Sequence, residues 1–249
     1  MKRLFALVLL STALILGTGS ARASALPANC SQAIVGSTNG WNDSHVQLSL
    51  LEKRGGQWTL VKGPFHGRLG KNGSVWGLGL TMPGHGQTAK KEGDLRSPAG
   101  VFLLGDAYGT VRTPDKHRSL TYRRVTPSDL WVDDPASPDY NRHIILKRPA
   151  STPWELQQQM KLNDYHHSLK LFIRHNSDET PGRPVPGAGS SIFFHIWRGN
   201  GAIPTAGCTT MSEENLRALI RWIDPAKTPV YILLPSREYM KLRTPWGLP

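Results

Sequence analysis

Two stretches of this chain dominate its interpretation: Ser191-Ile192-Phe193-Phe194-His195-Ile196-Trp197 and Thr205-Ala206-Gly207-Cys208-Thr209-Thr210-Met211. The first is an apolar run that predicts a buried strand carrying a histidine. The second places a lone cysteine directly after a glycine. Thiolates are the reactive form of cysteine, a nearby imidazole can accept the thiol proton, and a glycine turn can direct N–H groups at an oxyanion. Cys208 and His195 are therefore predicted to form a nucleophilic pair; a buried structural cysteine is the alternative.

Strand patterns dominate the rest of the chain. Residues 45–51 and 57–62 flank Arg54-Gly55-Gly56, which predicts a hairpin. Further strands are predicted over residues 74–80, 100–104, 143–147, 169–174, 191–197 and 229–234.

Two helices interrupt the strands. A capping box at residues 152–155, with proline at the first helical position, predicts a helix to about residue 162. Ser212 caps a second helix, whose apolar face consists of Leu216, Leu219, Ile220 and Ile223. Many strands, Gly/Pro-rich turns and few helices predict a mainly β fold, a sandwich or barrel with a few short helices.

The N-terminus has the pattern of a secretory signal peptide. Lys2 and Arg3 precede an apolar stretch from Leu4 to Leu16, and small residues at 21, 23 and 25 provide cleavage sites. A membrane anchor is the alternative, but the apolar stretch is short for one. We therefore expect residues 1–25 to be cleaved, residues 26–249 to form one domain, and the protein to lie in the periplasm or cell envelope without stable membrane insertion.

Charge and cysteine content limit the partners. The net charge of +12 favours anionic envelope polymers or membrane surfaces, and a basic but inert surface is the alternative. The basic residues form no stripe typical of nucleic-acid binding, so no nucleic-acid partner is expected. With only two cysteines, a Cys30–Cys208 disulfide is the structural alternative in an oxidising compartment. It is disfavoured because Cys30 is expected in a loose, polar N-terminal stretch, and it would block the nucleophile.

The order of these motifs resembles the YkuD-type L,D-transpeptidases. In that family a strand histidine precedes a (Ser/Thr)-x-Gly-Cys motif, a helix and a Thr-Pro-Val strand, which here begins at Thr228. Upstream, Ser97-Pro98-Ala99-Gly100-Val101-Phe102 is similar to the family's (Thr/Ser)-Pro-x-Gly-x-(Phe/Tyr) segment. The resemblance covers residues 90–235 and implies a single YkuD-like catalytic domain.

The resemblance also implies a reaction. Cys208 would attack an amide of a peptidoglycan stem peptide, form an acyl-thioester and pass the acyl group to the amine of another stem. His195 would be the base, the Ile196 carbonyl would orient its imidazole, and backbone N–H groups of Gly207 and Cys208 would bind the oxyanion. No metal or other cofactor is implied, and carbapenems are the implied covalent inhibitors.

This chain departs from the common family pattern on both sides of the cysteine. Ala206 stands where many members have histidine, and Thr210 stands where they have Arg or Asn. The missing cation leaves donor specificity open, including a 1-3 linkage in place of 3-3. Candidate substrate-binding residues are Thr205, Thr210, Trp197 and Arg198, the last as a substitute cation; a solvated surface arginine is the alternative for Arg198.

Other interpretations stay open at this stage. The same thioester resolved by water would make the protein an L,D-carboxypeptidase, and loss of chemistry would leave a non-catalytic envelope-binding module. His166, His167 and His175 are expected to be surface or core residues, because no metal motif surrounds them. Trp76, Trp131 and Trp154 are expected to pack in the core, with sugar stacking as the alternative.

Overall fold

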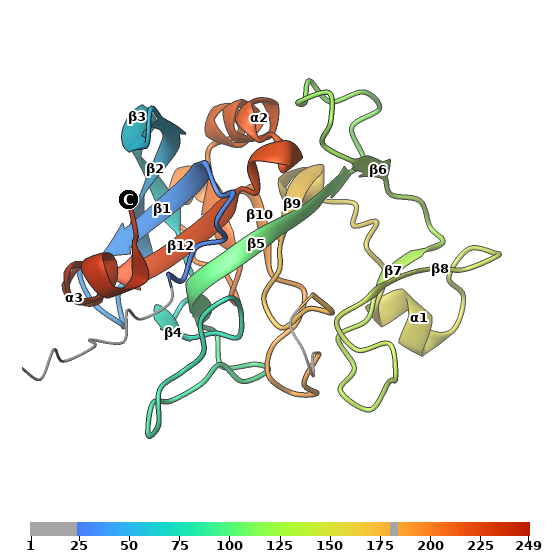
Figure 1. Ribbon diagram of the computed structural model, residues 1–249. Helices are drawn as coiled ribbons and strands as arrows, with labels where there is room; N and C mark the ends of the chain where they lie inside the picture. Colours follow the sequence, from blue (N-terminus) through green and yellow to red (C-terminus); the bar gives the residue numbers. More distant parts are fainter. Residues whose placement is uncertain (1–23, 180–183) are drawn as a thin grey trace, which may run out of the picture.

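Eight strands close into a barrel in the computed structural model, which describes residues 24–179 and 184–249. Residues 1–23, and with them most of the predicted signal peptide, lie outside the described residues. Around the barrel the strands follow the order β12 (Val230–Pro235), β1 (Gln32–Thr38), β2 (His45–Arg54), β3 (Gln57–Arg68), β11 (Thr209–Met211), β10 (Phe193–Ile196), β9 (Leu169–Ile173) and β5 (Ser97–Gly109) (Figure 1).

Strand β12 closes the barrel because it pairs on both sides, parallel to β1 and antiparallel to β5. Strands β10 and β11 are also parallel, and the other neighbours around the ring are antiparallel. Closure removes the unpaired edges that an open sheet would expose. The prediction of a mainly β sandwich or barrel with a few short helices is confirmed.

Smaller elements surround the barrel. Strands β4 (Ser74–Trp76) and β6 (Tyr122–Arg124) pair with β5, while β7 (Asp129–Trp131) and β8 (His143–Ile145) form a separate ribbon beside α1 (Pro153–Gln157). The longer helices are α2 (Glu213–Trp222) and α3 (Ser236–Trp246), and single 3₁₀ turns η1, η2 and η3 span Tyr165–His167, Gly199–Gly201 and Pro225–Lys227. Across residues 24–179 and 184–249, no helix has both the length and the apolarity needed to cross a bilayer.

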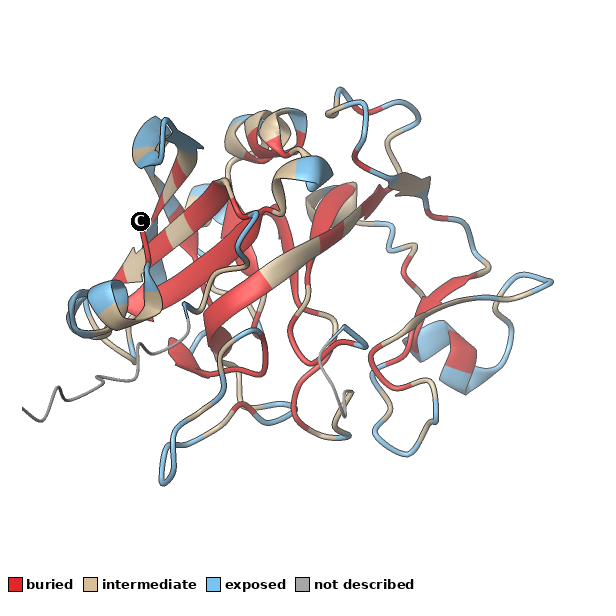
Figure 2. Ribbon diagram, viewed as in Figure 1, coloured by how far each residue is buried: buried red, intermediate tan, exposed pale blue. Residues whose placement is uncertain are grey.

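Apolar side chains form one core cluster inside the barrel, and α2 packs on it. Strands of the barrel are largely buried (Figure 2). The apolar face predicted for α2 is buried against this core, and Ser212 caps the helix by accepting a hydrogen bond from the Asn215 N–H at 3.3 Å. The largest fully buried side chains of this cluster include Ile34, Leu48, Leu50, Phe102, Leu171, Phe194, Met211 and Tyr231.

Cys30 lies in a second apolar cluster with Ala33, Val230 and Ile232, not in a loose polar stretch as the sequence suggested. It is 3% exposed, and burial raises the pKa of its thiol to about 11. Cys30 and Cys208 are both free thiols, so the disulfide alternative is wrong in this structure.

Several element boundaries differ from the prediction for identifiable reasons. The first helix ends at Gln157 instead of residue 162, because the next residues join the β7 ribbon: the Gln158 carbonyl accepts the Trp131 N–H at 2.8 Å. Strand β4 stops at Trp76, and the Gly77 and Gly79 that follow pack so closely against the Phe102 ring that a Cβ would clash. Strands β1, β6, β7 and β11 and helix α3 were not predicted.

Candidate active site

Cys208 lies directly before β11, beside the strand that carries His195. Because β10 and β11 are parallel with His195 opposite Thr210, the cysteine is brought to the histidine side of the barrel. The Cys208 thiol donates to the Ser191 carbonyl and accepts from the Phe193 N–H, each at 3.4 Å. The sulfur is thus held between its own loop and the entry to β10.

The Ser191 carbonyl is aimed at the sulfur by a strained backbone. Ser191 has φ of 54°, a left-handed conformation that costs free energy for a residue with a Cβ. Asn141 holds it there, because its Oδ1 accepts the Ser191 N–H at 3.0 Å, while its Nδ2 donates to the carbonyls of His175 and Asn176. One buried asparagine therefore links the β7–β8 ribbon to the thiol.

The His195 imidazole is oriented by backbone. Its Nδ1 lies 2.9 Å from the Ile196 carbonyl, the contact that the family resemblance implies for Ile196. A carbonyl can only accept, so Nδ1 is assigned the proton and Nε2 keeps a free lone pair. Burial, reinforced by the neighbouring His167, lowers the His195 pKa to about 3. At neutral pH the imidazole is uncharged and able to accept a proton.

The resting thiol is also uncharged. Burial raises the pKa of Cys208, opposed in part by the Phe193 N–H and by the Lys170 and Lys90 ammonium groups. A raised thiol pKa beside a lowered imidazole pKa disfavours a preformed thiolate–imidazolium pair. The geometry therefore suits general-base activation at the moment of attack.

His167 is part of this site, which the sequence did not predict. Its ring stacks on that of His195 with centroids 4.5 Å apart and planes at 27°. Its Nδ1 lies 3.0 Å from Asp164 Oδ2, and Arg198 forms an ion pair with the same carboxylate. The sequence feature that could have indicated this position is Asp164. It caps the 3₁₀ turn Tyr165–His167 and thereby fixes the position of His167.

The other predicted site residues fall into three groups. Arg198 and Thr210 line a cavity with the cysteine, although Thr210 is buried and its hydroxyl donates to the Arg68 carbonyl at 3.5 Å. Trp197 packs on the barrel core, and it is not among the described residues that line the cavities next to Cys208. Thr205 lies within the cysteine loop.

The Thr205 hydroxyl organises this loop. Its Oγ1 accepts the Gly207 N–H at 3.0 Å and donates to the Cys208 carbonyl at 2.6 Å. The Gly207 N–H that the family resemblance assigns to the oxyanion is thus engaged, and it can bind an oxyanion only if Thr205 Oγ1 releases it. The Cys208 carbonyl also accepts from Ser97 Oγ at 3.4 Å, which ties the upstream family-like segment to the nucleophile.

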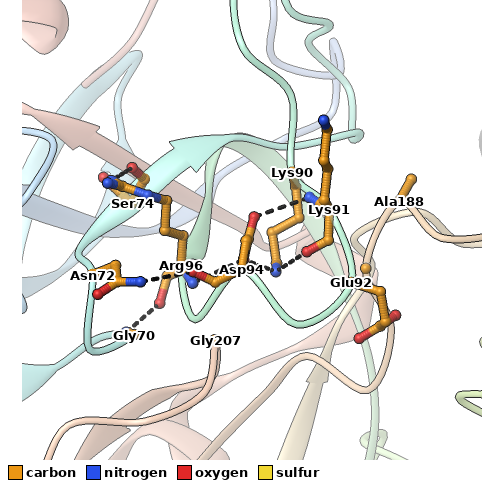
Figure 3. A network of polar contacts seen from close by, with 12 residues as sticks. Gly70, Asn72, Ser74, Lys90, Lys91, Glu92, Asp94, Arg96, Ala188 and Gly207 are labelled. Atoms are coloured by element: carbon orange, nitrogen blue, oxygen red, sulfur yellow. Dashed lines mark hydrogen bonds and ion pairs between the residues drawn. The ribbon is translucent and has the colours of Figure 1, made fainter.

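A polar network supports the loop from behind (Figure 3). The Lys90 ammonium is buried and forms an ion pair with Asp94 at 2.5 Å, while Asp94 also accepts the N–H groups of Lys91 and Arg96 at 2.9 Å. A Cβ on Gly207 would lie 3.1 Å from the Arg96 carbonyl. The close packing explains why glycine stands before the nucleophile.

Two cavities meet at Cys208. One, of about 210 Å³, is lined by Arg198, Ile203, Pro204, Thr205, Ala206 and Thr210. The other, of about 180 Å³, is lined by residues that include Trp131, Asp133, Met160, Lys170 and Phe193. Both include His167, His195 and Cys208. A larger cavity of about 500 Å³, lined in part by Trp41 and Trp76, does not include these three residues.

The remaining candidates have structural roles. His175 is fully buried; its Nδ1 accepts the Leu78 N–H at 3.1 Å and its Nε2 lies 3.0 Å from the Ala188 carbonyl. Trp76 and Trp131 are buried as expected, whereas Trp154 is 36% exposed and its Nε1 donates to Asp134 at 2.8 Å. Within the described residues, no group of three or more potential metal ligands is found.

Acid is expected to destabilise the fold through its buried histidines. Burial lowers the pKa of both His175 and His195 to about 3, whereas histidine in an unfolded chain titrates near 6.5. The unfolded state then binds more protons below pH 6.5, so stability falls as the pH drops from there towards 3. Lowering the pH from 7 to 5 should cost about 2 kcal/mol for each of these histidines.

Urea unfolding at pH 7 and pH 5 measures this loss. Carboxylates with lowered pKa values, such as Asp129 and Asp164 at about 2, change the unfolding free energy mainly below pH 5. The change in unfolding free energy between pH 7 and pH 5 therefore comes mainly from histidines. His175→Gln should reduce the difference by about 2 kcal/mol while lowering stability at pH 7. Part of the difference remains, because burial also lowers the pKa of His143 and His167. Equal unfolding free energies at the two pH values would contradict buried neutral histidines.

The chain was also compared with known proteins. Residues 66–232 match the family model for the L,D-transpeptidase catalytic domain, YkuD. The match runs from β3 to β12 and contains both His195 and Cys208. No curated protein matches the chain.

Solved structures give weaker matches. The helical cell shape determining protein Pgp2 from Campylobacter jejuni matches at 14% identity with a TM-score of 0.37, over 82% of this chain and 48% of that one. Bd1075 from Bdellovibrio bacteriovorus matches at 13% identity with a TM-score of 0.39, over 91% of this chain and 58% of that one. This chain therefore spans about half the length of these structures.

The matched residues make up more than half of the chain and include both members of the predicted nucleophilic pair. The chain belongs to the YkuD family of L,D-transpeptidase catalytic domains.

Proposed function

We propose that this protein is a peptidoglycan L,D-transpeptidase of the cell envelope, exported by residues 1–25, that uses Cys208 as its nucleophile. One observation carries the proposal: a neutral Cys208 thiol shares two cavities with a neutral His195, whose Nδ1 is held by the Ile196 carbonyl. This arrangement provides a nucleophile and a free base at one solvent-accessible point.

The reaction begins with acyl transfer to the enzyme. His195 Nε2 accepts the thiol proton while Cys208 Sγ attacks the carbonyl of the donor stem, and the Cys208 N–H stabilises the oxyanion. Collapse of the tetrahedral intermediate breaks the C–N bond, and the imidazolium returns the proton to the leaving amine. A thioester on Cys208 remains.

The second half passes the acyl group to an acceptor amine. The amine loses a proton to His195, attacks the thioester carbonyl and releases the Cys208 thiolate, which takes the proton back. Two cavities that meet at the sulfur support transfer over hydrolysis, because a donor in one leaves the other for an acceptor. The L,D-carboxypeptidase alternative needs only water at the second site.

Purified protein incubated with disaccharide-tetrapeptides tests the proposal by mass spectrometry. Cross-linked dimers are expected, and fragmentation of the dimer distinguishes a 1-3 from a 3-3 linkage. Tripeptide without dimer would establish a carboxypeptidase instead. Unchanged substrate, together with no carbapenem adduct on Cys208, would indicate that the protein is a non-catalytic envelope-binding module.

His167 is expected to act as a positioning residue. His167→Ala removes the ring that stacks on His195 and should lower kcat about tenfold, because small errors in orientation are costly in a proton-transfer step. His167→Phe keeps an aromatic ring and should recover most of the rate. The matched control is His166→Ala on the same turn, whose side chain lines neither site cavity. Equal rates for His167→Ala and wild type would contradict this role.

A further inference from the structure

Lys170 is a buried cation that has no anionic partner among the described residues. It lies on β9 directly opposite His195 on β10, and the residue is only 4% exposed. None of the carboxylates in the described residues forms an ion pair with it. Buried charges are costly unless they are paired, so this ammonium creates a local demand for an anion.

The hydrogen bonding of Lys170 is also incomplete. A lysine ammonium has three N–H donors, yet within the described part of the chain its only acceptor is the Met160 carbonyl at 3.3 Å. The Phe193 ring lies beneath it, 5.2 Å from Nζ to the centroid, and gives a modest cation–π contact. Two donors therefore remain for a ligand.

This ammonium lines the 180 Å³ cavity together with the reacting groups. The same cavity is lined by Cys208, His195 and His167. It is also lined by Asp133, an exposed residue in the loop after β7. Burial lowers the pKa of Lys170 to about 8, while the Cys208 sulfur raises it. The group is therefore mainly charged at pH 7, and the cavity that it lines at the cysteine is not the one that Arg198 and Thr210 line.

We propose that Lys170 binds a carboxylate of the peptide substrate in the cavity beside Cys208. The ligand class follows from the site: one ammonium with two free donors matches a small monoanion, and the neighbouring Phe193, Trp131 and Met160 side chains favour an organic group. The assignment rests on the proposed function, since stem peptides end in a carboxylate. Lys170 thereby supplies the cation that is missing where Thr210 replaces the common Arg.

Alkylation of Cys208 tests this site without any peptide substrate. In a Cys30→Ala background only the Cys208 thiol remains. Iodoacetate and iodoacetamide both release iodide, so the ratio of their alkylation rates compares a reagent that carries a carboxylate with one that carries a neutral amide. The iodoacetate-to-iodoacetamide ratio should fall about 10- to 100-fold in Lys170→Met, the range expected for a hydrogen-bonded charge. Lys147→Met, which removes an exposed lysine outside this cavity, should leave the ratio unchanged.

A ratio that Lys170→Met does not change would overturn the proposal, because a lysine that acts only on the thiol pKa alters both rates equally. If Lys170→Met does not fold, a second measurement tests the proposal: whether a small carboxylate protects Cys208 of the Cys30→Ala protein from alkylation. Acetyl-D-alanine should slow alkylation by iodoacetamide, whereas acetyl-D-alanine amide should not. Equal protection by both compounds, or by neither, would refute a carboxylate site.

Turnover identifies which peptide provides the carboxylate. Amidation of the terminal carboxylate of the donor, and separately of the acceptor, should lower kcat/KM in the wild type for one of the two, and Lys170→Met should abolish that difference. If stem peptides are not turned over at all, the proposed function fails while the alkylation ratio still decides the carboxylate site.

Discussion

Cys208→Ala is expected to abolish dimer formation, with a loss of at least about 10⁴-fold in kcat/KM. The reason is chemical, since a methyl group cannot form the thioester through which both half-reactions pass. Carbapenem treatment should add one inhibitor mass to the wild type and none to this variant. The assay is the disaccharide-tetrapeptide incubation with detection by mass spectrometry.

Cys30→Ala is the matched control for this substitution. Cys30 is buried in the second apolar cluster and its thiol pKa is about 11, so it is a poor nucleophile. Its replacement should leave turnover and carbapenem acylation unchanged and cost about 1 kcal/mol of stability. Full turnover by Cys208→Ala would exclude the thioester mechanism.

His195→Ala should reduce kcat about 10²- to 10⁴-fold at pH 7, the contribution typical of a general base. Because burial raises the pKa of Cys208, its thiol needs a base to give up its proton near neutrality. The rate of the variant should increase with pH as hydroxide takes over the deprotonation. The wild type, whose His195 is already neutral, should change much less between pH 6 and 8.

Iodoacetamide alkylation separates this effect from substrate binding. His195→Ala should slow alkylation of Cys208 at pH 7 and restore it at pH 9, whereas His66→Gln, at an exposed histidine on β3, should behave like the wild type. A variant that reacts at the wild-type rate at pH 7 would mean that the thiol is ionised independently of His195.

Parts of the fold were predictable because they depend on local patterns. The hairpin around Gly55 and the cap of α2 at Ser212 follow from turn chemistry and hydrogen bonding within a few residues. Helix α1 was predicted five residues too long, since its C-terminal end is decided by pairing with β7, a segment more than twenty residues earlier. Strand β1 was missed, although its pairing with β12 and β2 is central to barrel closure.

The site residues also divide into those that the local sequence predicts and those that depend on tertiary structure. Cys208 and His195 were recognised from spacing, and the structure brings them to adjacent parallel strands. Lys170 and His167 were not, because nothing in the local sequence indicates that β9 pairs with β10 or that the turn before β9 lies against His195. Cys30 was placed in a polar stretch because its neighbours are polar, while its burial comes from contacts with β1 and β12.

The sequence alone thus determined the mainly β class and the proposed nucleophile and base, since these follow from residue identity and short-range periodicity. Only the tertiary structure decided the protonation states of the pair, the engagement of the Gly207 N–H by Thr205, and the Lys170 ammonium beside the thiol, which forms no ion pair with any described residue. These properties depend on desolvation and on distances between strands far apart in the chain, and burial of a charge is determined by everything that surrounds it.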